Sequence, residues 1–210
     1  YLDLCYKTIL KHCDKDFKIN LLNEITVCEY LPDLRNDLKS FPIPQKADYI
    51  RYKLLYKYGG IWLDADTILF KSLTPIIDKL KNYDFVGFGC HYNDCSKSGY
   101  PKPANWVMAT IKESKLMNLC VKECDKLLDN KKNFNYHSLG RLNVWKNIDY
   151  LIKNDPLWNY YHYPSKCLER DSKNNKLINK RMLSNEEIDN NCKNDLLFIP
   201  IYNTAPGFPT

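Results

Sequence analysis

The sequence predicts an α/β protein with a largely parallel central sheet. Short apolar segments, typical of buried strands, alternate along the chain with longer segments of helical periodicity. The pair Gly59-Gly60 separates one such helix from one such strand. A length of 210 residues and a hydrophobic fraction of 44% allow a substantial core and exclude a disordered, collagen-like or low-complexity chain.

The predicted elements follow one another with few long connections. The first helix carries apolar residues at helical spacing, and a later helix ends where Gly59 accepts the left-handed C-cap geometry. Pro75 is tolerated in the first turn of the next helix. We expect helices at 2–13, 32–38, 46–58, 74–80, 115–128 and 139–152. We expect strands at 17–22, 61–63, 83–88, 106–110 and 196–201.

The charge pattern favours a small anionic partner over nucleic acid. Lys and Arg number 31 against 25 Asp and Glu, which gives a net charge of +6. Nearly all the basic residues are dispersed lysines, whereas readers of nucleic acid depend on arginine and on dense basic patches. No apolar run approaches the roughly 20 residues of a membrane helix, so we expect no membrane anchor in this chain. The chain starts at Tyr1 rather than Met, and we expect the natural N-terminus to lie upstream.

The nine cysteines follow neither a zinc-ribbon nor a Cys-x-x-Cys pattern. Cys90 and Cys95 could close a loop, and Cys120 and Cys124 have helical spacing, so reduced thiols and one or more disulfides both remain open, with reduced thiols favoured. The sequence contains no Asn-x-Ser/Thr glycosylation site. This leans towards the cytoplasm rather than the Golgi lumen, and the compartment stays open.

Four polar residues around the double glycine form the strongest chemical signal. Asp48 and Arg51 are three residues apart and share one face of a helix. Asp64 and Asp66 follow a buried strand and project to the same side. Ligands of open α/β sheets bind beyond the carboxyl ends of strands, so we expect a site there.

Two adjacent carboxylates repel one another unless a cation lies between them. Oxygen ligands suit Mg²⁺ or Mn²⁺, which would bridge to a diphosphate and stabilise a phosphate leaving group. The arginine fork of Arg51 and the carboxylate of Asp48 suit the hydroxyls of a sugar. The alternatives are a solvated turn at Asp64 and Asp66 and a surface ion pair at Asp48 and Arg51.

The run from 47 to 69 resembles the DxD-centred core of the capsular polysaccharide synthesis glycosyltransferases. It is similar also to initiating mannosyltransferases and to glucosylating toxins. The matching positions are Ala47, Asp48, Arg51, Leu54, Leu55, Tyr58, Gly59, Gly60, Asp64 and Asp66. The resemblance implies a GT-A-type fold, with residues 1–210 as one domain that lacks its first strand.

The resemblance also implies the chemistry. It suggests a glycosyltransferase of polysaccharide biosynthesis that moves a sugar from a UDP- or GDP-linked donor to a glycan or other hydroxyl acceptor, with retention of configuration. Asp66 resembles the direct Mn²⁺ ligand, and Asp64 resembles the residue that contacts the ribose or a metal-bound water. Asp48 and Arg51 resemble the pair that orients the donor sugar. In the proposed front-face substitution, the leaving diphosphate itself helps to deprotonate the acceptor.

A further metal ligand is not identified by motif. The candidates are Asn105, His137, His162 and Asn203. His137 precedes a helix and could instead have a surface or capping role, and His162 lies in an aromatic loop that could simply pack. Tyr52 is expected at the helix–sheet contact or at the edge of the donor pocket. A zinc site formed by His12, His91 and cysteines has poor spacing.

Two other classes compete with transfer of a sugar. Haloacid-dehalogenase-type phosphatases also carry a strand followed by DxD, but their second aspartate precedes Gly-Thr, whereas Thr67 follows Asp66 directly. A catalytically degenerate module that binds glycans or nucleotide sugars would keep the fold without turnover.

Overall fold

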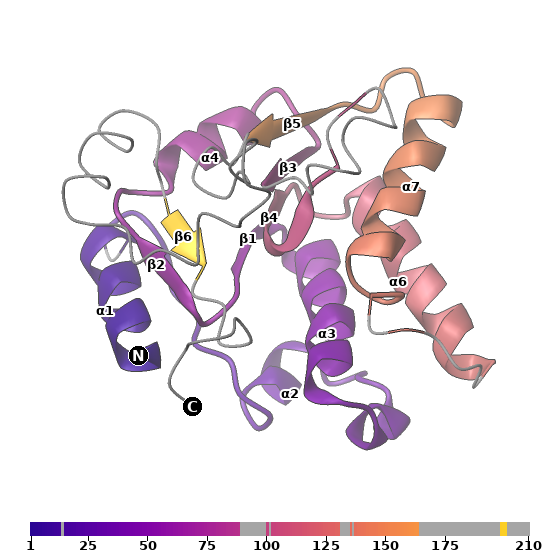
Figure 1. The fold of residues 1–210 in the computed structure, drawn as a ribbon, viewed down its shortest axis with the longest axis horizontal. Coiled ribbons are helices and arrows are strands. Elements are labelled where there is room, and N and C mark those ends of the chain that lie inside the picture. Colours follow the sequence, from indigo (N-terminus) through magenta and orange to yellow (C-terminus); the bar gives the residue numbers. More distant parts are fainter. Residues whose placement is uncertain are drawn as a thin grey trace, which may run out of the picture.

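The fold is a central sheet with helices packed on both faces (Figure 1). The computed structural model describes residues 1–163 except 14, 89–99, 101, 131–134 and 136, together with the backbone of 198–200. The strand order of the sheet is β1-β4-β3-β5. The strands are β1 (Gly60–Leu63), β4 (Ala104–Thr110), β3 (Phe85–Phe88) and β5 (Tyr160–Tyr163). The α/β class is therefore confirmed.

The direction of the strands corrects one prediction. β4 pairs antiparallel with both β1 and β3, and only β3 and β5 pair in parallel, so the described sheet is mixed rather than largely parallel. The reason is the insertion of β4 in reverse between β1 and β3. β1, β3 and β5 therefore still run in the same direction. The sequence predicted β1, β3 and β4 as strands, but it predicted neither the reversal of β4 nor the strand β5.

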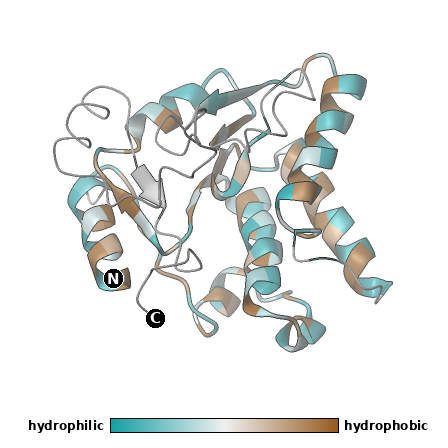
Figure 2. Ribbon diagram, viewed as in Figure 1, coloured by the Kyte–Doolittle hydropathy of each residue, from teal (hydrophilic) through white to brown (hydrophobic). Residues whose placement is uncertain are grey.

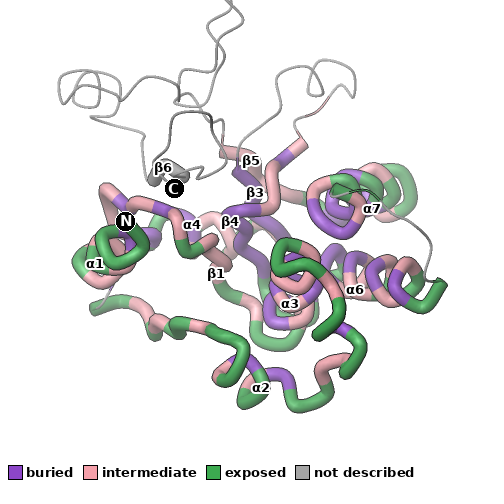
Figure 3. The backbone as a smooth tube through the Cα atoms, turned by 60° about the horizontal axis from the view of Figure 1, so that its bottom comes forward, coloured by how far each residue is buried: buried purple, intermediate pink, exposed green. Residues whose placement is uncertain are grey.

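Each face of the sheet has its own hydrophobic core, because side chains alternate along a strand. One core lies against α3 (Ile43–Tyr58), α6 (Lys115–Asp129) and α7 (Arg141–Asn154), and it receives Phe85 and Met108. The inward sides of these three helices are the buried sides in Figure 3. α6 and α7 change from hydrophobic to hydrophilic around their circumference in Figure 2, as the predicted amphipathic helices require.

The second core lies on the opposite face of the sheet. It contains Val86, Val107 and Ala109 from the strands and Ile76 from α4 (Thr74–Leu80). Cys13, the last residue of α1 (Leu2–Cys13), belongs to it as well. α1 packs beside β2 (Thr67–Leu69), which pairs antiparallel with β6 (Phe198–Pro200). β2 was not expected from the sequence, because only three residues separate it from β1.

Two other predicted elements differ from the structure. Residues 17–22 contain no strand, since they find no partner strand within the described chain, and they line an apolar cavity. The predicted helix at 32–38 is wrong. A short helix, α2 (Val27–Tyr30), precedes it, and a 3₁₀ turn, η1 (Asn36–Ser40), begins later. Arg35 is extended, with ψ of 130°, and this interrupts any helix through that stretch.

The thiols and the described helices bear on two further expectations. Cys5, Cys13, Cys28, Cys120 and Cys124 are free, and all but Cys28 are buried, which agrees with reduced structural thiols there. Cys90, Cys95 and the remaining cysteines lie outside the described residues, as does His91. None of the described helices combines the length and the apolarity needed to cross a lipid bilayer.

Candidate functional site

A tight reversal of the chain brings α3 and β1 together. Gly59 and Gly60 have φ of 67° and 91°, values that side chains rarely tolerate. A Cβ at Gly59 would lie 2.6 Å from the amide nitrogen of Lys112, so no larger residue fits. β1 therefore returns alongside α3, and the residues after β1 meet the middle of the helix.

Arg51 lies on α3 and contacts both this helix and the residues that follow β1. Its guanidinium donates to Asp48 Oδ1 at 2.8 Å and to Asp64 Oδ1 at 2.6 Å. Trp62 stacks on the guanidinium, with the ring centroid 5.1 Å from Cζ, and donates its indole N–H to Asp64 Oδ1 at 2.7 Å. The side chain of Arg51 is only 4% exposed. Arg51 thus orients two carboxylates and presents almost no surface of its own.

Asp48 is held from several sides. Asn105, on β4, donates its amide to Asp48 Oδ1 at 2.7 Å. Gly140 approaches so closely that a Cβ there would lie 2.7 Å from Asp48 Oδ2. Burial raises the pKa of Asp48 to about 6, the charge of Asp64 adds to this, and Arg51 and Asn105 oppose it. Asp48 therefore titrates near neutral pH.

The two carboxylates of the DxD segment differ in their contacts. The amide of Asp64 donates to the Trp106 carbonyl at 2.9 Å, and its carboxylate uses Oδ1 for both Arg51 and Trp62. Asp66 is half-buried, and among the described residues no side chain donates a hydrogen bond to it. Burial raises the pKa of Asp66, and the negative charge of Asp64 raises it further. Asp66 and Asp64 Oδ2 are therefore the oxygens left for a ligand.

These residues line one cleft of about 600 Å³, a size that suits a small-molecule ligand. Of the residues predicted from the sequence, the cleft includes Asp48, Arg51, Asp64, Asp66, Asn105 and His137. Other lining residues come from α1, from 22–27 and from the start of α7. The structure therefore brings together six positions that are as far as 89 residues apart in the chain.

Tyr52 lies outside the lining of this cleft. It is fully buried, and its hydroxyl donates to the Gly140 carbonyl at 2.9 Å. Tyr52 thus fixes the backbone that closes against Asp48, at the helix–sheet contact.

The remaining candidate metal ligands differ in whether they lie at the cleft. His137 is exposed and lines the cleft, and its pKa is lowered by partial burial and by the charge of Arg141. His162 lies on β5 opposite Gly87, on a strand rather than in the loop that the sequence suggested, and it is absent from the described lining. Asn203 lies outside the described residues.

The sequence reasoning missed three residues of the site. Trp62 was not among the expected site residues, although it is two residues from Asp64 and the same alternation places both side chains on one side of the strand. Gly140 and Arg141 line the cleft at the start of α7. A glycine directly before a helix is a signal for close approach, but nothing in the sequence shows that the partner is Asp48.

The described residues fit a divalent ion only in part. They contain no group of three or more His, Cys, Asp or Glu side chains that could enclose a metal. They do offer the free oxygens of Asp64 and Asp66 beside each other, and burial, together with the negative charge of Asp64, raises the pKa of Asp66. Mg²⁺ and similar ions commonly take one or two carboxylates and complete their shell with water and phosphate, so this pair fits that mode of binding.

Comparisons with known proteins match mainly the first part of the chain. Residues 3–83 match the family described as glycosyltransferase sugar-binding region containing DXD motif. The chain is also similar to the O-glycosyltransferase PaGT of Phomopsis amygdali, with 41% identity over 46 residues. That similarity covers 20% of this chain and 11% of the length of PaGT. The matched family region contains Asp48, Arg51, Asp64 and Asp66, and it ends before Asn105 and the start of α7.

Proposed function

We propose that this chain transfers a sugar from a nucleotide-diphosphate donor to a hydroxyl acceptor. The proposal is supported by the match of residues 3–83 to the family of glycosyltransferase sugar-binding regions containing the DXD motif. The observation that supports this most directly is the cleft in which Arg51 holds Asp48 and Asp64 while Asp66 stays without a side-chain partner among the described residues. The donor class is proposed as UDP- or GDP-linked, and the acceptor as a glycan or another hydroxyl compound.

The bond changes of the proposed reaction are simple. The acceptor oxygen attacks the anomeric carbon, and the bond from that carbon to the diphosphate oxygen breaks. The proton of the acceptor hydroxyl passes to the leaving diphosphate. Attack from the face of the departing diphosphate retains the configuration, which is the stereochemistry proposed here.

The residues of the cleft have separate tasks in this proposal. Asp48 accepts hydrogen bonds from hydroxyls of the donor sugar through Oδ2, since Oδ1 is already engaged by Arg51 and Asn105. Asp64 Oδ2 and Asp66 would hold Mn²⁺ or Mg²⁺ through their free oxygens. Such an ion, when bound, supplies positive charge that stabilises the diphosphate as it leaves.

The test compares Asp66→Asn with Asp78→Asn, whose carboxylate is exposed on α4 and pairs with Lys81. The measurements are Mn²⁺-dependent hydrolysis of UDP- and GDP-sugars and the melting temperature with Mn²⁺ and each nucleotide. We expect Asp66→Asn to lose hydrolysis and the metal-dependent shift together, and Asp78→Asn to keep both.

The outcomes separate this function from its alternatives. A nucleotide sugar that stabilises the wild type without turnover would favour the binding module. Full activity of Asp66→Asn with Mn²⁺ would contradict the assignment of the metal ligand. Stable labelling of an aspartate by phosphate would indicate a phosphatase instead.

A further inference from the structure

The cations that line the cleft differ in their partners. Lys46 pairs with Glu24 at 3.3 Å, and Arg51 pairs with two carboxylates of the site. Arg141 also lines the cleft, but it has no ion pair within the described part of the chain. Its Nε is buried and makes no hydrogen bond with any of the described residues. Leaving a buried N–H of a charged group without an acceptor costs free energy. A ligand that accepts from this guanidinium would remove that cost.

An aromatic ring holds Arg141 in place without neutralising it. The guanidinium Cζ lies 5.3 Å from the centroid of Trp145, one turn further along α7. Trp145 is 8% exposed and is fixed by an indole hydrogen bond to the Pro103 carbonyl at 2.6 Å. Lys102 lies over the same ring at 5.8 Å, yet it pairs with Asp149 at 2.9 Å. Arg141 and Lys102 thus both lie over the ring of Trp145. Of the two, only Lys102 forms an ion pair with a described residue.

The position of Arg141 is defined by its neighbour. Gly140 packs directly on Asp48 and Asn105, so Arg141 begins α7 at the Asp48 end of the cleft. The N-terminus of this 14-residue helix adds positive potential at the same place. Partial burial lowers the pKa of His137, so among the described residues at the start of α7 the positive charge is that of Arg141.

We propose that Arg141 binds an oxyanion of the substrate, an inference that rests on the function proposed above and assigns a further substrate-contacting residue. The arginine fork matches phosphate and carboxylate groups with two parallel hydrogen bonds. The oxyanion is either the leaving diphosphate or an acidic group on one of the two sugars. Both sources share the chemistry that an unneutralised, preorganised guanidinium recognises.

The test measures binding to wild type, Arg141→Gln and Lys102→Gln. The probes are inorganic pyrophosphate, UDP and GDP, each with and without Mn²⁺, and glucuronate, titrated by isothermal calorimetry. We expect Arg141→Gln to weaken at least one of these roughly ten- to hundredfold, the usual loss for a charged hydrogen-bonded contact. Lys102→Gln removes the same charge from the same ring and is expected to leave every dissociation constant within about twofold, because its partner is Asp149.

The pattern of losses identifies the source of the oxyanion. Loss for pyrophosphate and the nucleotides assigns Arg141 to the diphosphate, whereas loss for glucuronate alone assigns it to an acidic sugar. Arg141→Lys should recover part of the affinity, since it restores the charge but not the fork. Unchanged binding of all probes by Arg141→Gln, or equal losses in both variants, would overturn the inference.

Failure of the proposed function gives a different pattern. If wild type binds pyrophosphate and Arg141→Gln does not, while Asp66→Asn keeps its metal-dependent activity, the inference on Arg141 stands and the metal assignment fails. Wild type that binds none of the probes overturns both. Melting temperatures of the three proteins show whether a loss of binding reflects a loss of fold.

Discussion

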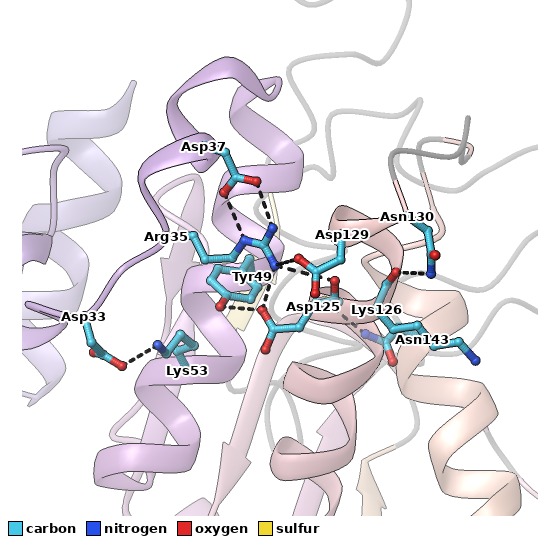
Figure 4. A network of polar contacts seen from close by, with 11 residues as sticks. Asp33, Arg35, Asp37, Tyr49, Lys53, Asp125, Lys126, Asp129, Asn130 and Asn143 are labelled. Carbon is cyan, nitrogen blue, oxygen red and sulfur yellow. Dashed lines mark hydrogen bonds and ion pairs between the residues drawn. The ribbon is translucent and has the colours of Figure 1, made fainter.

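Two arginines, Arg35 and Arg51, are each held by carboxylates in a cluster that includes a residue of α3. Arg35, before η1, donates to Asp37 and forms ion pairs with Asp125 and Asp129 on α6, and Tyr49 donates to Asp125 at 2.8 Å (Figure 4). Arg51 joins Asp48 and Asp64 in the cleft. The chemistry of the two clusters is the same, and their surroundings are not.

Burial separates the two clusters. Arg35 is 19% exposed and its acidic partners are between 39% and 67% exposed, whereas Arg51 is 4% exposed. Ion pairs in contact with water contribute little, while a buried pair must offset a large desolvation cost and leaves a charge stranded when one member is removed. The Arg35 cluster therefore holds the segment before η1 against α6. The Arg51 cluster carries a large desolvation cost, and it lines the cleft in which the proposed reaction takes place.

The largest expected difference between the clusters is in stability. Arg51→Leu leaves the buried carboxylate of Asp48 without its cationic partner and close to the charge of Asp64, so we expect a loss of about 3–5 kcal/mol in the free energy of unfolding. Arg35→Leu should lose about 1 kcal/mol or less. Urea denaturation of both variants measures this. Equal losses of stability in the two variants would show that burial does not distinguish the two clusters.

The second prediction concerns pH. The folded pKa of Asp48 is about 6, above its value of 3.8 in an unstructured chain, so the folded state binds the proton more tightly. The stability that this group contributes is therefore complete below about pH 4 and is lost as the pH rises through about 6, with a total change of about 1–3 kcal/mol. Asp48→Asn should flatten this slope in urea titrations at pH 4 to 7.

Activity should respond to Asp48 in the opposite direction. If the ionised carboxylate binds the donor sugar, the rate of nucleotide-sugar hydrolysis rises as the pH passes about 6. A rate that is flat between pH 5 and 7 in the wild type would contradict a role for ionised Asp48. Asp125→Asn, in the exposed cluster, serves as the control that keeps the wild-type profile.

The smallest expected effect on activity is at the exposed cluster. Tyr49→Phe removes one hydrogen bond to Asp125 and keeps the ring in the core, so we expect a loss of about 0.5–1.5 kcal/mol. Transfer or hydrolysis should not change, since the cluster does not line the cleft. A loss of activity without a loss of stability would connect this cluster to the site.

The sequence was most informative where local rules decide the outcome. The helix that carries Asp48 and Arg51, the glycine reversal and the short strand before Asp64 were all predicted, because caps and periodicity are local. The pairing of Arg51 with Asp48 was also expected from their spacing, and its second bond to Asp64 follows only from the way β1 returns along α3.

The parts that were missed depend on distant contacts. Whether β4 pairs parallel or antiparallel with β1 and β3 is decided by packing, and no local pattern in 104–110 encodes this direction. The extended backbone at Arg35 follows from acidic partners 90 residues and more further along the chain. Arg141 could be noticed as a basic residue at a helix start, but its place beside Asp48 needs the three-dimensional arrangement.

The fluorescence of Trp62 can report whether the cleft is occupied. The chain has four tryptophans, and Trp106, Trp145 and Trp158 are between 6% and 8% exposed, while Trp62 is more open and lines the cleft. Quenchers dissolved in water will therefore act mainly on the emission of Trp62. A ligand that fills the cleft shields this indole, so occupancy can be followed by fluorescence without a label and without knowledge of the acceptor.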